Sequence, residues 1–145
     1  MSEVDAQDQF DSAHALSASA ASSNYIDKKH SAYFGAGADL VAEVLVTTAA
    51  DHTTGDETYT VKLQHDSDPA FGTVADLTDV VTIPRTAVAG DRFYVDVPPN
   101  VNVSEYIRLY YTLGGTTPTI SVTAYLKPRW SVESVWKAAS GITTR

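Results

Sequence analysis

The sequence predicts an all-β domain of antiparallel strands, and three observations lead to this prediction. Composition favours sheet, because Val, Ile, Thr and Tyr are common while Leu, which fills most helical bundles, is scarce. Apolar and polar residues alternate with a period of two along several segments. Segments rich in Gly, Pro, Asn and Asp separate them about every 8–12 residues, a spacing typical of sandwiches and barrels.

The first part of the chain carries the weakest pattern. Residues 1–23 are rich in Ala, Ser and Asp and hold few large apolar groups, so we expect an N-terminal arm that does not fold by itself. Alternation from Leu16 to Ala20 predicts a short strand within this arm, and another short strand is expected near Tyr25. Residues 40–49 predict a more uniformly apolar strand.

Four further segments alternate cleanly between an apolar and a more polar face, as antiparallel strands with one dry face do. They are residues 57–65, 91–97, 105–113 and 119–127. Residues 73–83 are less regular and predict two short strands or one strand with a bulge. The predicted body therefore spans residues 24–127 and contains about eight strands.

After Pro128 the apolar spacing changes from two to that of a helix. Val132, Val135 and Trp136 follow this spacing, with Ser131 as a candidate N-cap and Gly141 as a stop. We therefore expect a short helical tail in a C-terminal extension, residues 128–145. Charge divides at the same place: residues 1–126 hold 17 acidic and 6 basic residues, whereas residues 127–145 have a net charge of +3.

Composition excludes several classes of function. A net charge of −8 argues against long-range attraction to nucleic acid or anionic membranes. The absence of Cys excludes disulfides and thiolate metal sites. The acidic N-terminal residues lack an apolar run, so no signal peptide is expected, and the apolar run at residues 40–46 is too short to span a membrane.

No motif for catalysis or for binding a cofactor is present, and we expect neither an enzyme nor a cofactor site. The four histidines, His14, His30, His52 and His65, are too far apart in sequence for a recognisable metal site, although imidazole is a common ligand. Residues 66–68 read Asp-Ser-Asp before a proline, which favours a turn over a calcium site.

Aromatic and cationic residues supply the candidate contact surfaces. Tyr106, Arg108 and Tyr110 share the more polar face of one predicted strand, with Tyr125 on a possible neighbour. This pattern fits either a protein or sugar contact surface or a sheet face covered by a loop. Tryptophans in the C-terminal extension must be covered by the chain's own sheet or by another chain, and we favour another chain.

Several blocks of the sequence resemble capsid cement proteins of tailed bacteriophages. Besides Asp5-Ala6-Gln7 and Phe10, they are SAHALSASAASSNYID (residues 12–27), LQHDSDPAFGTVADL (63–77), VAGDRFYVDVP (88–98) and YIRLYYTLGGTTPTISVTAYL (106–126). They occur in the family's order and cover most of residues 5–126, and the last block is the most specific. The C-terminal extension departs from the family pattern, so its role is open.

The resemblance implies a jelly-roll domain without catalytic residues. It implies a small homo-oligomer, a dimer or trimer, that bridges major capsid subunits on the outer surface of the virion after synthesis in the bacterial cytoplasm. A carbohydrate- or receptor-binding module on a phage particle is the alternative, since jelly rolls often serve as lectins. The candidate residues for capsid or subunit contacts are Phe10, Leu16, Tyr25, Tyr106, Arg108, Tyr110, Trp130, Val132, Val135 and Trp136.

Overall fold

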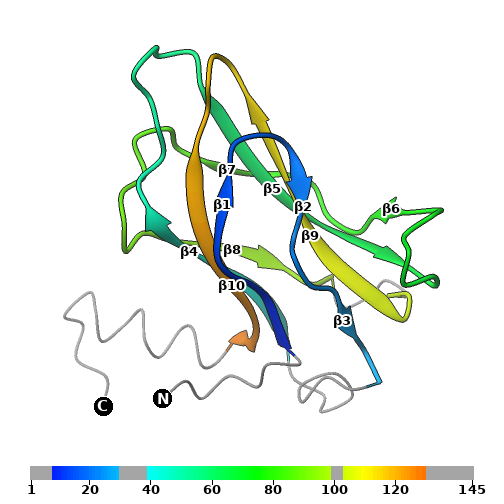
Figure 1. Cartoon of the computed structure of the whole chain (residues 1–145). Helices are drawn as coiled ribbons and strands as arrows, with labels where there is room; N and C mark the ends of the chain where they lie inside the picture. Colours follow the sequence, from blue (N-terminus) through cyan, green and yellow to red (C-terminus); the bar gives the residue numbers. More distant parts are fainter. Residues whose placement is uncertain (1–7, 30–38, 99–102, 130–145) are drawn as a thin grey trace, which may run out of the picture.

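The computed structural model describes residues 8–29, 39–98 and 103–129, which form ten strands in two antiparallel sheets (Figure 1). The four-stranded sheet has the order β1 (Gln9–Leu16), β10 (Ile120–Pro128), β4 (Leu40–Thr48) and β8 (Arg92–Asp96). In the six-stranded sheet, β2 (Ala20–Ala21) and β3 (Ile26–Asp27) pair with β9 (Tyr106–Gly114). Next to β9 lies β5 (Thr58–Asp66), which pairs with β6 (Ala75–Asp76) and β7 (Val81–Ile83). Among these residues, no helix has the length and apolar character needed to cross a membrane.

One hydrophobic core draws on both sheets. The inward residues alternate along each long strand, as with Tyr59, Val61 and Leu63 on β5, and the same period buries Ile107 and Leu109 on β9. The all-β prediction is therefore confirmed, and the shared core is compatible with a β-sandwich. The predicted strands at 40–49, 57–65, 91–97, 105–113 and 119–127 are confirmed, and 73–83 contains two short strands.

The N-terminal region differs from the predicted arm. Residues 9–16 form β1, which pairs with β10, and the side chains of Phe10 and Leu16 lie in the core. The strand predicted from Leu16 to Ala20 is wrong, because the chain crosses there from one sheet to the other. The described part of the arm thus completes both sheets of its own chain.

Strand β1 lacks a clean alternation because its register with β10 shifts twice, between Gln9 and Asp11 and between Asp11 and His14. Ala13 has a positive φ of 47°, and its N–H donates to Thr123 Oγ1 at 2.8 Å. These irregularities turn the Asp11 side chain into the interior, where it is fully buried.

The far end of β10 extends one residue beyond the predicted body boundary. Pro128 pairs with Leu40 at a position that needs no donor to β4, since the N–H of the next residue, Arg129, donates to Asp39 O at 2.8 Å. The predicted helical tail lies outside the described residues and stays a prediction.

The two lateral edges of the molecule differ. At one edge, the chain passes directly from β1 in the four-stranded sheet to β2 in the six-stranded sheet (Figure 1). At the other edge, β8 ends one sheet and the short strands β6 and β7 end the other, without a described strand beyond them. We call these the closed edge and the open edge.

Candidate functional site

The outer face of the six-stranded sheet carries a cluster of aromatic rings around one arginine. We call it the tyrosine–arginine face and define it by Tyr25, Phe71, Tyr106, Arg108 and Tyr110. The three residues from β9 share this face because side chains two apart along a strand point the same way. Tyr25 precedes β3, and Phe71 comes from the loop after β5.

Arg108 is the centre of this face. Its guanidinium carbon lies 4.4 Å from the centroid of the Phe71 ring and 5.8 Å from that of Tyr110, within the range of cation–π attraction. Its Nε donates to Gln64 Oε1 at 2.9 Å, and Gln64 Nε2 donates to Asp76 Oδ1 at 3.2 Å. The arginine is therefore fixed in position, with charge and aromatic surface presented together.

The loop that contains Phe71 is held by hydrogen bonds to the Asp66 carboxylate. The Asp66 carboxylate accepts the N–H of Asp68 at 3.1 Å and the N–H of Thr73 at 2.8 Å, which closes the loop on itself. Burial alone would raise the pKa of Asp66, but backbone N–H groups led by that of Thr73 lower it below its ordinary value. Phe71 itself has a φ of 54°, a strained conformation for a residue with a side chain, and this conformation places its ring under Arg108.

Tyr25 is the most exposed ring of the face, with 46% of its surface accessible. It packs edge-on against Tyr106 at a centroid distance of 5.3 Å and tilts against Phe71 at 6.0 Å. A hydrogen bond with Glu105, assisted by burial, raises the pKa of the Tyr106 hydroxyl. The face thus offers one exposed ring, Tyr25, held by ring contacts with its neighbours.

The outer face of the four-stranded sheet is organised differently. Glu43 lies in the middle of this face, with Lys127 Nζ 2.7 Å from its Oε1 and Arg92 Nε 3.6 Å from its Oε2. An ion pair of 2.8 Å between Arg129 and Asp96 spans β4 between β10 and β8. We call this surface the ion-paired face, because most of its charges are matched within the chain.

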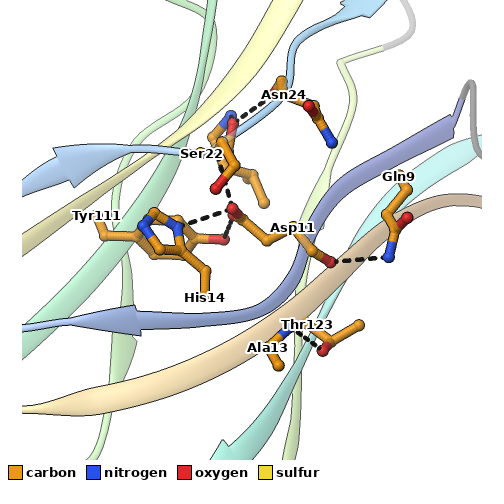
Figure 2. Close-up of polar contacts among 10 residues, drawn as sticks. Gln9, Asp11, Ala13, His14, Ser22, Asn24, Tyr111 and Thr123 are labelled. Carbon is orange, nitrogen blue, oxygen red and sulfur yellow. Dashed lines mark hydrogen bonds and ion pairs between the residues drawn. The ribbon is translucent and has the colours of Figure 1, made fainter.

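A third polar cluster lies inside the molecule, at the closed edge (Figure 2). One Asp11 oxygen accepts the Tyr111 hydroxyl at 2.6 Å, and the other accepts the Ser23 N–H at 2.7 Å and His14 Nδ1–H at 2.8 Å. Burial and then the neighbouring Asp11 charge raise the pKa of Tyr111 well above its ordinary value. Since Asp11 and Tyr111 are both buried, this cluster acts as an anchor between β1 and β9.

The structure brings together four of the predicted contact residues: Tyr25, Tyr106, Arg108 and Tyr110. Tyr125, predicted as a possible neighbour, lies on the ion-paired face, where Lys127 Nζ is 5.7 Å from its ring centroid. The core positions of Phe10 and Leu16 take these two residues out of the exposed contact surface. Trp130, Val132, Val135 and Trp136 lie outside the described residues.

Sequence reasoning missed Phe71 as a member of the face. The ring reaches Arg108 through a left-handed residue in a loop, and Phe carries no sequence signal for that conformation. The available signal was the Asp-Ser-Asp-Pro turn at residues 66–69, which places the loop but not the ring.

The described residues considered for metal binding have other partners, and His30 lies outside the described residues. His65 Nδ1 accepts the Ser104 N–H at 3.0 Å, and His52 Nδ1 lies 3.4 Å from Ala50 O. In residues 66–70 the carboxylates cap backbone N–H groups, as expected for a turn. Within the ranges that the structure describes, no three His, Asp or Glu side chains form a group suited to a metal ion.

Comparison with known proteins identifies the family. The Bbp16 family matches residues 10–126, which cover both sheets from β1 to Leu126 in β10. The chain belongs to the Bbp16 family, whose name is of the type given to bacteriophage proteins. No curated protein matches the chain.

Proposed function

We propose that this protein is a structural virion protein that decorates the outside of an icosahedral phage head and cements it by bridging major capsid subunits. The observation that carries the proposal is membership of a phage-type family over residues 10–126, together with a tyrosine–arginine face whose Tyr25 ring is exposed. The resemblance of the sequence to phage cement proteins points the same way.

The strand order supports a jelly roll as the finer fold class. If β2 with β3, and β6 with β7, each count as one interrupted strand, the chain has eight strands in two sheets of four. The pairs β1–β10, β2/β3–β9 and β4–β8 then nest around one another, as when a long hairpin is rolled up. Eight strands in two Greek keys define the jelly roll.

The tyrosine–arginine face has the composition of a protein contact. Tyr and Arg are enriched at the buried centres of interfaces, where a few such residues dominate affinity. Arg108 and Phe71 are already fixed by contacts within the chain, so little side-chain ordering is needed on binding. A copy that binds two capsid subunits at once stabilises the assembled shell by mass action, because the separated subunits bind it more weakly.

Binding to heads that lack the protein tests the proposal. We expect purified protein to saturate such heads and to raise their resistance to heat. Tyr110→Ala and Arg108→Ala should weaken binding at least tenfold, in line with the loss of an interface hot spot of about 2 kcal/mol.

Tyr125→Ala is the matched control for Tyr110→Ala, since each tyrosine is half-buried and lies under a cation at almost the same distance, 5.7 and 5.8 Å. Unaltered binding by Arg108→Ala and Tyr110→Ala would assign the contact to another surface. Absence of any binding to heads would contradict the proposed role itself.

A carbohydrate- or receptor-binding module would use the same exposed Tyr25 ring as a stacking platform. Glycan array binding that is lost in Tyr25→Ala, without saturable binding to heads, would favour this alternative. We expect the reverse result.

A further inference from the structure

The open edge of the molecule contains a groove that the tyrosine–arginine face does not explain. It has a volume of about 600 Å³ and lies between β8 of one sheet and β6 and β7 of the other. Its lining includes the apolar side chains of Leu77, Val81, Val95 and Pro98, with Asp79 and Asp96 beside them. This volume lies within the range of small-ligand pockets, roughly 300–1,000 Å³, and is enough for large side chains.

The groove is a continuation of the core. Val81 pairs with the buried Val61, so its side chain points between the sheets, and Val95 and Leu77 are members of the core cluster. A large apolar side chain inserted here would therefore extend the core at the edge where β6 and β7 are too short to close it.

Among the described residues, the backbone of β8 also has no pairing strand on this side. Val46 N–H donates to Asp91 O and Val97 N–H donates to Leu40 O, so the odd-numbered residues of this segment bond toward β4. The N–H and C=O groups of Arg92, Tyr94 and Asp96 point away from β4, and β8 has no second partner strand in the part of the chain that the structure describes. Proteins commonly cover such an edge.

We propose that the groove at the open edge is the binding site for the chain's own C-terminal segment, residues 130–145. The position of Arg129 carries this assignment: its guanidinium is 2.8 Å from the carboxylate of Asp96, a groove residue at the end of β8. The last described residue before the segment is thus tied through its side chain to the end of β8 that borders the groove. From β10 to the far side of β8 is three strand spacings, roughly 14 Å, which about five extended residues can cross.

The amino-acid sequence and the charge of residues 130–145 also suit this groove. The segment holds both tryptophans of the chain, Trp130 and Trp136, together with the apolar Val132 and Val135, which suit the apolar lining. Residues 130–145 hold Lys137 and Arg145 against Glu133, a net charge of +1, and the groove carries aspartates. The inference is independent of head binding and concerns how the chain completes its own core.

Intrinsic fluorescence tests this site directly, because Trp130 and Trp136 are the only tryptophans and both lie in the segment. In the full chain we expect a blue-shifted emission maximum and weak quenching by iodide. Val81→Arg, which fills the groove, should shift the emission to the red and raise the quenching constant toward that of free tryptophan.

Val80→Arg is the matched control, since Val80 is adjacent in sequence, 53% exposed and not part of the groove lining. Solvent-exposed tryptophans in the full chain, or equal spectra for the two variants, would overturn the proposal. Recovery of the blue-shifted emission on mixing Val81→Arg with a chain ending at Arg129 would instead show exchange of segments between copies, and would also overturn it.

A cysteine pair keeps the test valid if Val81→Arg fails to fold. The chain has no cysteine, so a disulfide between Asp79→Cys and Ala139→Cys would report only on this contact. We expect a disulfide within one monomer after mild oxidation, and none with Thr112→Cys, which lies on the other side of the six-stranded sheet, as partner. Failure to form, or a disulfide that links two copies, would contradict the proposal.

Discussion

Strand β9 places two adjacent tyrosines in opposite environments. Tyr111 points inward, is 1% exposed and donates its hydroxyl to the buried Asp11. Tyr110 points outward, is half-buried and lies near the Arg108 guanidinium. The same residue type thus supports the fold on one side and offers a contact surface on the other.

The two tyrosines differ in how fully their hydrogen-bond and ring partners are enclosed. The partners of Tyr111 are fully enclosed, so their loss leaves buried polar atoms unpaired. The partners of Tyr110 stay accessible to water, so its loss costs little until another molecule covers the face. Substitutions of the inner residues should therefore lower the stability of the fold, whereas substitutions of the outer residues should mainly weaken binding to a partner.

The largest effect is expected at Asp11. Asp11→Ala removes the acceptor for the Tyr111 hydroxyl, the Ser23 N–H and His14, all at the closed edge. We expect a loss of about 3–5 kcal/mol in the free energy of unfolding, measured by urea denaturation. A loss below about 1 kcal/mol would mean that water replaces the carboxylate and that the cluster is no anchor.

Removal of single hydroxyls compares the adjacent tyrosines directly. Tyr111→Phe should lower the free energy of unfolding by about 1.5–3 kcal/mol, because a buried carboxylate loses a donor. Tyr110→Phe should change it by less than about 0.5 kcal/mol. Equal losses in thermal or urea denaturation would break the distinction between the two sides of β9.

Backbone strain at Phe71 predicts an unusual order of stabilities. Both Phe71→Ala and Phe71→Gly remove the ring under Arg108, but only glycine adopts a φ of 54° without a steric penalty. Phe71→Gly should therefore be the more stable of the two by about 1 kcal/mol in urea denaturation. The reverse order would show that the loop relaxes once the ring is absent.

The smallest expected effect is that of pH on the loop held by the Asp66 carboxylate. The pKa of Asp66 is lowered in the folded chain, so its contribution to stability is present at neutral pH and is lost as the pH falls through that lowered pKa. Below a pH of about 4 we expect the Thr73 amide to lose protection from hydrogen exchange. Asp66→Asn is the control, since its protection should not follow this titration.

The long strands were predictable because both their faces obey a period of two. From Tyr59 to Leu63 on β5, for example, every second residue is buried. Strand β1 was not predictable, because two register shifts and the left-handed Ala13 remove the alternation. Strands β2 and β3 are only two residues each, too short for a periodic signal, although the short strand expected near Tyr25 is present as β3.

The candidate site was predictable in part. The spacing of Tyr106, Arg108 and Tyr110 along one strand places them on one face whatever the tertiary structure. The contributions of Tyr25 and Phe71 depend on how loops distant in sequence fold back, as the Asp66 turn shows. The Asp11–Tyr111 bond joins residues 100 positions apart, and the local sequence around neither residue specifies it.

The irregular pairing of β1 has a consequence for the behaviour of the free protein. An outermost strand with straight, unpaired backbone invites the same strand of a second molecule and can seed edge-to-edge polymerisation. The two shifts in β1 twist and interrupt that run of donors and acceptors. We therefore expect β1 to resist edge-to-edge pairing between copies of the chain.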